Sequence, residues 1–91
     1  MESAAENKSD DQMFEVYPNP STENWAEVHF SPVESNGHLS VSDMNGSIVY
    51  STTLNEGDYR KRIDVPYISG AYIVRLVTAK RTETQRWVVT L

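Results

Sequence analysis

The chain has 91 residues, with 13 Asp plus Glu, 8 Lys plus Arg, a formal net charge of −5 and no cysteine. This length allows one small domain, and the lack of cysteine excludes a disulfide framework, a zinc ribbon, an iron–sulfur site and a thiol nucleophile. The longest apolar run, residues 71–74, is far shorter than the roughly 20 residues of a membrane helix, so no transmembrane segment is expected.

The N-terminal segment differs in composition from the rest of the chain. Residues 1–12 contain no aromatic and no β-branched residue, so they have little apolar surface to bury, and we predict a flexible acidic linker there. The domain is expected over residues 13–91. Residues 16–91 carry 8 acidic and 7 basic side chains. Such a balance does not supply the basic surface that phosphate binding requires, so nucleic acid is not an expected partner.

Seven short segments after residue 12 are predicted to be strands. Apolar and polar side chains alternate in most of them, which is typical of half-buried antiparallel strands. Their spacing predicts an all-β fold, an immunoglobulin-like antiparallel β-sandwich. The predicted strands cover residues 14–17, 25–30, 38–43, 47–53, 59–65, 70–78 and 84–90.

Proline and glycine mark the expected turns. Pro18 and Pro20 have fixed φ angles and no N–H group, so they are expected to end the first strand. Asn45 and Gly46 predict a two-residue type I′ turn between the third and fourth strands, because both residues accept positive φ. The Asp43 carboxylate is expected to accept hydrogen bonds from amides of that turn.

The sixth predicted strand is apolar on both faces, which predicts a central position in a sheet. One face carries Tyr72, Val74 and Leu76, and the other carries Ile73, Arg75 and Val77. Arg75 either packs its stem along the strand with its head in water or on a carboxylate, or it belongs to a partner-facing patch. The pattern leaves Trp87 either in that patch or in the core. Gly70 and Gly46 are expected to hold backbone conformations that other residues resist.

No arrangement of residues indicates catalysis. His29 and His38 lie on different predicted strands without further ligands at metal-binding spacing, and no nucleophile–base pair is present. We therefore predict no catalytic, cofactor-binding or metal-binding residue, and no enzyme. Trp25 and Trp87 could stack on sugars, although single large aromatic residues in so small a domain more often fill the core.

Four motifs follow one another along the chain. In order they are Val16-Tyr17-Pro18-Asn19-Pro20-Ser21, Leu39-Ser40-Val41-Ser42-Asp43-Met44-Asn45-Gly46, Gly70-Ala71-Tyr72-Ile73-Val74-Arg75 and Arg86-Trp87-Val88-Val89. Together they resemble a known family, the C-terminal sorting domain (type A) of the type IX, or Por, secretion system in Bacteroidota. The resemblance covers about residues 14–91.

The resemblance implies a secretion signal for a passenger fused at its N-terminal side. An outer-membrane translocon would recognise the folded domain in the periplasm, and the passenger would reach the outer membrane surface or the extracellular space. A sortase-like signal peptidase would usually remove the domain, and the passenger would then be attached to the cell surface. Cleavage is expected within residues 1–12, because a protease needs an extended backbone.

The predicted recognition surface combines the last strand with one face of the sixth. Its residues are Ile73, Arg75, Val77, Arg86, Trp87, Val88, Val89, Thr90 and Leu91. The alternative hypothesis is an immunoglobulin-like adhesion or carbohydrate-binding domain of a secreted protein, which would present Trp25 or Trp87 as an aromatic platform. A structural stalk is a third, weaker hypothesis.

Overall fold

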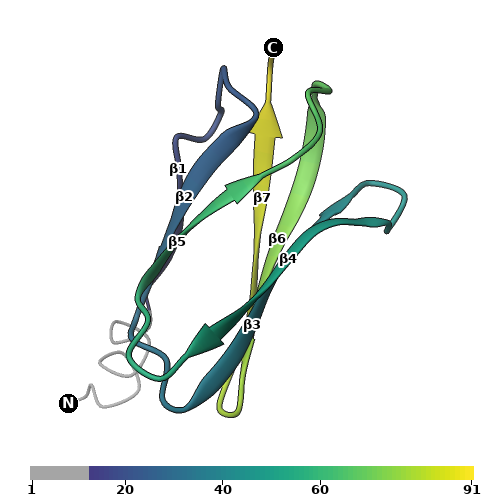
Figure 1. The fold of residues 1–91 in the computed structure, drawn as a ribbon. Coiled ribbons are helices and arrows are strands. Elements are labelled where there is room, and N and C mark those ends of the chain that lie inside the picture. Colours follow the sequence, from purple (N-terminus) through teal and green to yellow (C-terminus); the bar gives the residue numbers. More distant parts are fainter. Residues whose placement is uncertain (1–12) are drawn as a thin grey trace, which may run out of the picture.

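The computed structural model describes residues 13–91, which form two antiparallel sheets packed face to face (Figure 1). The predicted linker lies outside the described residues. One sheet has the order β1-β2-β5, formed by β1 (Phe14–Tyr17), β2 (Trp25–Phe30) and β5 (Arg60–Asp64). The other has the order β4-β3-β6-β7, formed by β3 (Asn36–Asp43), β4 (Ile48–Asn55), β6 (Gly70–Thr78) and β7 (Thr82–Val89).

The architecture confirms the predicted immunoglobulin-like sandwich. The chain passes from one sheet to the other after β2, after β4 and after β5, which is the crossing pattern expected of such folds. The predicted strand ends agree with the structure to within a few residues, and β6 is an interior strand of its sheet, between β3 and β7.

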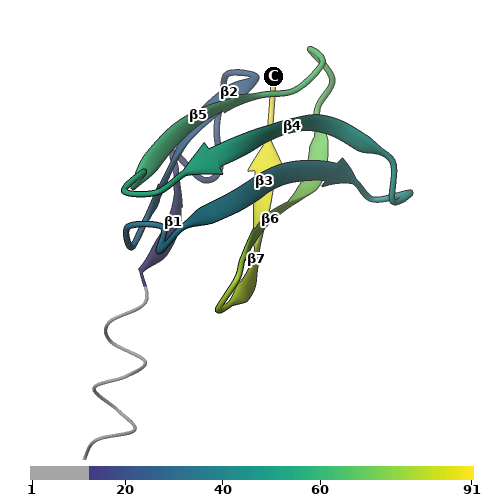
Figure 2. The same cartoon turned by 60° about the horizontal axis from the view of Figure 1, so that its bottom comes forward.

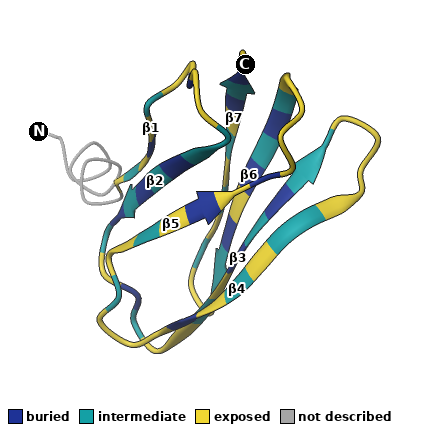
Figure 3. Ribbon diagram, turned by 45° about the horizontal axis from the view of Figure 1, so that its top comes forward, coloured by how far each residue is buried: buried dark blue, intermediate teal, exposed yellow. Residues whose placement is uncertain are grey.

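The core lies between the two sheets, and every strand contributes inward-facing side chains at alternate positions (Figure 3). Complete burial of a large apolar side chain contributes about 1.5–3 kcal/mol to stability. The largest fully buried side chains are Trp87, Phe30, Leu39, Leu54, Ile63 and Leu76.

Four residues, 44–47, separate β3 from β4, so the predicted two-residue turn is wrong. Gly46 has φ +90° and donates its N–H to the Asp43 carbonyl at 3.0 Å, the pattern of a turn closed by a left-handed glycine. The predicted role of Asp43 is confirmed, because its Oδ1 accepts the N–H groups of Asn45 at 2.9 Å and Ser47 at 3.0 Å. These two bonds stabilise the longer loop.

Gly70 does not have the special backbone conformation that was predicted for it. The glycines with positive φ are Gly46 and Gly57, and a Cβ atom added at Gly70 would meet nothing within 4 Å. Gly70 begins β6 as an ordinary strand residue, so the expected intolerance of larger residues there is wrong.

Within residues 13–91 the structure contains no helix of the length and apolar character needed to cross a membrane.

Candidate functional site

The outer face of the four-stranded sheet carries most of the predicted recognition residues. On β6, Ile73 and Val77 are half-buried and Arg75 is exposed, between positions that face the core. On β7, Arg86 lies opposite Ile73, and Val88 lies opposite the neighbouring Ala71. Thr90 and Leu91 follow β7 and are exposed.

Trp87 and Val89 belong to the core, and placing them on the recognition surface was wrong. Their exposed fractions are 0% and 1%, because the odd-numbered residues of this part of β7 point between the sheets. The Trp87 indole Nε1 donates to the Pro18 carbonyl at 3.2 Å, and its ring centroid lies 5.9 Å from that of Tyr72. A partner of the folded domain therefore cannot contact either side chain.

The pairing of β4, β3, β6 and β7 aligns three rows of side chains across this outer face. The middle row contains small hydroxyl side chains on both sides of Arg75. In strand order the rows are Ile48, Ser42, Ile73 and Arg86; then Ser51, Ser40, Arg75 and Thr84; then Thr53, His38, Val77 and Thr82.

A shallow groove of about 450 Å³ runs along this face, beside the β3–β4 loop. The hairpin that carries this loop extends past the rest of the sheet, as Figure 2 shows. Arg75 and Ile73 contribute to the groove from β6. The full lining is Ser42, Asp43, Met44, Gly46, Ile73, Arg75, Thr82 and Thr84.

The loop at residues 18–21 is hydrogen-bonded along the outer edge of β7. The Asn19 side chain donates from Nδ2 to the Arg86 carbonyl at 2.7 Å, and its Oδ1 accepts the Val88 N–H at 3.0 Å. The Ser21 N–H donates to the Val88 carbonyl at 2.8 Å, and the Ser21 carbonyl accepts the Thr90 N–H at 2.8 Å. Unpaired strand edges invite pairing with other chains, and these four bonds occupy the last part of this one.

The prolines beside Asn19 end β1 at Tyr17 as predicted, and both X–Pro peptide bonds, at Pro18 and Pro20, are cis. The contact with β7 was not predicted. The sequence contains a signal for it, since an Asn amide held between two prolines offers one donor and one acceptor at fixed positions. Nothing in the local pattern indicates that its partner lies about 69 residues away.

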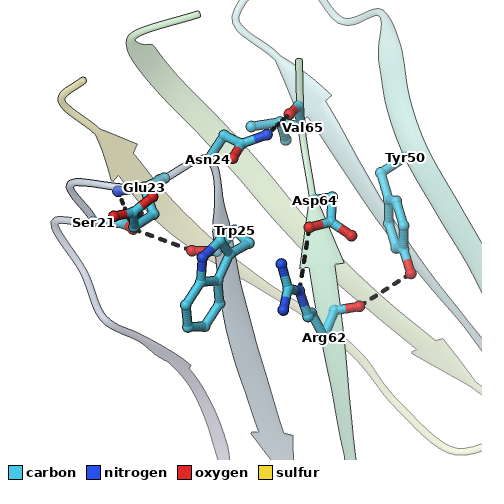
Figure 4. A network of polar contacts seen from close by, with 8 residues as sticks. All are labelled: Ser21, Glu23, Asn24, Trp25, Tyr50, Arg62, Asp64 and Val65. Carbon is cyan, nitrogen blue, oxygen red and sulfur yellow. Dashed lines mark hydrogen bonds and ion pairs between the residues drawn. The ribbon is translucent and has the colours of Figure 1, made fainter. Parts of the chain in front are cut away.

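The outer face of the three-stranded sheet has a different character (Figure 4). The Arg62 guanidinium lies 4.5 Å from the centroid of the Trp25 ring, and its Nε lies 3.3 Å from Asp64 Oδ1. One ring face of Trp25 is therefore occupied by an internal cation. With Trp87 in the core and Arg62 stacked on Trp25, nothing in the structure favours the carbohydrate-binding hypothesis.

Two side chains have altered acid–base properties. Burial, with a smaller contribution from Asp43, raises the pKa of Tyr72, whose hydroxyl donates to the Ile68 carbonyl at 2.7 Å. A backbone hydrogen bond is the main cause of the lowered pKa of Glu34. His29 and His38 lie on different sheets, and residues 13–91 contain no cluster of three His, Asp or Glu suited to a metal ion.

Comparison with known proteins gives both a family and a fold relative. The family model described as "Secretion system C-terminal sorting domain" matches residues 15–90. The structure of CopC from Methylosinus trichosporium OB3b is similar, with a TM-score of 0.56 and 15% identity over 87% of this chain and 91% of that one, which shows a shared fold alone. No curated protein matches in sequence. Because the family model spans nearly the whole chain, the chain belongs to the C-terminal sorting domains of the type IX secretion system, which direct secreted proteins to the cell surface or the extracellular space.

Proposed function

We propose that residues 13–91 are a folded, non-catalytic signal that the outer-membrane translocon of the type IX system binds in the periplasm. The observation that carries this proposal is the family match over residues 15–90. A passenger fused before residue 1 would be carried across the outer membrane together with this domain. The fold suits such a role, because a rigid surface loses little conformational entropy when a partner binds it.

The recognised surface, in this proposal, is the outer face of β6 and β7 with the residues that follow β7. Interior pairing holds β6 between β3 and β7, and the loop at residues 18–21 holds the far edge of β7. The backbone beneath the surface is thus fixed on both sides. The side chains proposed to contact the translocon are Ile73, Arg75, Val77, Arg86, Val88, Thr90 and Leu91.

After export, a sortase-like signal peptidase would cleave within residues 1–12, and the passenger would be attached to the cell surface. The composition of this segment supports the assignment, since it has no aromatic or β-branched residue and a protease needs an extended backbone at the bond that it cuts.

An export assay tests the proposal. Residues 1–91 are fused to the C-terminus of a periplasmic fluorescent reporter in a bacterium with a type IX system, and the control fusion lacks residues 84–91. We expect reporter on the surface or in the medium only with the complete domain, and mass spectrometry of its new C-terminus locates the cut. Retention of the complete fusion in the periplasm, with the domain folded, would contradict the proposed function.

A further inference from the structure

We infer that the outer face of the four-stranded sheet binds an acidic, extended segment of a translocon protein, whose carboxylates pair with Arg75 and Arg86. This inference rests on the proposed function and adds the chemistry of the partner. It depends on the charge of the face, on the availability of its two arginines, and on its shape.

The charge of this face is opposite to that of the whole chain. The chain has a net charge of −5, yet the three cross-strand rows of this face contain Arg75 and Arg86 and no Asp or Glu. Complementary charge across an interface guides the encounter of two proteins and excludes wrong partners. A cationic face on an acidic protein therefore selects an acidic partner.

The arginines of the two sheets differ in what they contact. On the other sheet, Arg62 is stacked on Trp25 and paired with Asp64. Within residues 13–91, the ion pairs of the structure include neither Arg75 nor Arg86, and both residues are exposed. Their positive charges are available to form salt bridges with carboxylates of a partner.

The spacing of the two arginines fits a strand-like ligand. Arg75 lies opposite Thr84, so Arg86 is its diagonal neighbour on the adjacent strand, at a distance of roughly 7–8 Å for such pairs. Alternate residues of an extended segment are about 6.6–6.8 Å apart. Acidic side chains at alternate positions of one segment could therefore meet both arginines.

The groove provides room for such a segment. It has a volume of about 450 Å³, with Ile73 and Met44 supplying apolar contact and Thr84 a hydroxyl donor beside Arg75. One acid, Asp43, also lines the groove, but its Oδ1 already accepts two N–H groups of the hairpin loop. The hairpin thus bounds the groove, and the Asp43 carboxylate at that end is partly engaged by amides of its own loop.

An anionic lipid surface fits this face less well than an acidic protein segment. Membrane binding through basic side chains contributes about 1 kcal/mol per residue and commonly uses clusters of 4–8 of them. This face has two arginines, separated by hydroxyl and apolar side chains. A protein segment that lies in the groove at Arg75 and extends to Arg86 on the adjacent strand is held by two salt bridges and by apolar contacts, whereas two charges alone hold a membrane weakly.

The test uses the reporter fusion with residues 1–91 and compares three variants. Arg75→Glu/Arg86→Glu reverses the charge of the proposed site, Arg75→Lys/Arg86→Lys preserves it, and Arg62→Glu reverses one charge on the other sheet. We expect the double Glu variant to lower export by roughly tenfold or more, because like charges then face each other. The Arg62→Glu fusion should be exported like the wild type, and the double Lys fusion at least half as well.

The outcomes distinguish failure of this inference from failure of the proposed secretion function. Retention of the wild-type fusion would defeat the proposed function, and the inference with it. If the wild-type fusion is exported and a folded double Glu variant is exported equally well, or if the double Lys variant fails as the Glu variant does, the inference alone is wrong. Urea unfolding establishes folding. If the Glu variant unfolds, Arg75→Ala/Arg86→Ala replaces it. We expect a smaller loss of export from the Ala variant, because it removes the salt bridges without adding like charges, and export equal to that of the wild type would overturn the inference.

A second measurement distinguishes protein from lipid. The purified 91-residue chain is sedimented with phosphatidylglycerol vesicles, and we expect it to remain in the supernatant at physiological salt. Sedimentation that the double Glu variant loses would assign this face to anionic lipid and would overturn the inference.

Discussion

Replacement of Asn19 by Ala tests whether the loop at residues 18–21 holds the last strand in place. The substitution removes two hydrogen bonds, from Nδ2 to the Arg86 carbonyl at 2.7 Å and from the Val88 N–H to Oδ1 at 3.0 Å. Each bond is expected to contribute about 0.5–1.5 kcal/mol. Because Arg86 is exposed, water replaces part of what is lost, and we expect a decrease of about 1–2 kcal/mol in the free energy of unfolding.

Thermal unfolding measures the effect on the whole domain, and hydrogen exchange measures it at single amides. In a domain of this size, 1 kcal/mol corresponds to roughly 4–8 °C in Tm, so thermal unfolding should show a fall of about 5–15 °C. Hydrogen exchange is more specific. The Val88 amide loses its acceptor and should exchange faster by about tenfold per 1.4 kcal/mol of lost protection, whereas the Thr90 amide keeps its bond to the Ser21 carbonyl and should change less.

Asn45→Ala is the matched control. Asn45 is exposed in the β3–β4 loop, where its backbone N–H, which alanine retains, donates to Asp43; we expect a change within about 0.5 kcal/mol. If Asn19→Ala leaves both the free energy of unfolding and the Val88 exchange rate at their wild-type values, water fully replaces the two bonds and our interpretation of the loop is refuted.

Three further predictions concern stability. Gly46→Val should lower the free energy of unfolding by about 1–3 kcal/mol because Gly46 has φ +90°; Gly70→Val, where the added atoms meet open space, is the control, and an equal shift of both urea midpoints would contradict the argument. Burial raises the pKa of Tyr72, so the neutral phenol contributes fully to the free energy of unfolding below the ordinary tyrosine pKa near 10, and this contribution is lost as pH rises through the folded-state pKa. In alkaline unfolding, the stability of Tyr72→Phe should therefore depend less on pH than that of the wild type. The pKa of Glu34 is lowered, so its ionised carboxylate adds to the free energy of unfolding at neutral pH, and this stabilisation is lost as pH falls through the folded-state pKa. Plotted against pH, the stabilities of Glu34→Gln and wild type should converge in acid. Parallel curves would argue that the carboxylate does not stabilise the fold.

Local pattern carried enough information to predict the strands. Alternation along β6 correctly puts Tyr72 and Val74 on one face and Arg75 on the other, because successive side chains of a strand point to opposite sides; the structure shows that the first face is the core. The same rule could not place Trp87, since β7 has large side chains on both faces, and only its register with β6 and the loop at residues 18–21 shows which face is inward.

The errors at the turns have a different origin. Asn45 and Gly46 fit both a two-residue turn and the longer loop observed, in which the Asp43 carboxylate accepts hydrogen bonds from two amides. Gly70 shows the limit of residue type as a guide, because glycine permits unusual φ angles but does not require them. The proposed surface lies on the two strands named from the sequence, yet its groove and the separation of its charges arise from pairing among four strands, some of them distant in sequence.

The loop at residues 18–21 makes closure of the sandwich depend on the last strand. Asn19 precedes its partners Arg86 and Val88 by 67 and 69 residues, so they are made after it. A product truncated before Arg86 would lack these partners and the indole of Trp87 that fills the core, and so could not close the sandwich. A translocon that binds only the closed sandwich would therefore not export a passenger whose sorting domain is truncated.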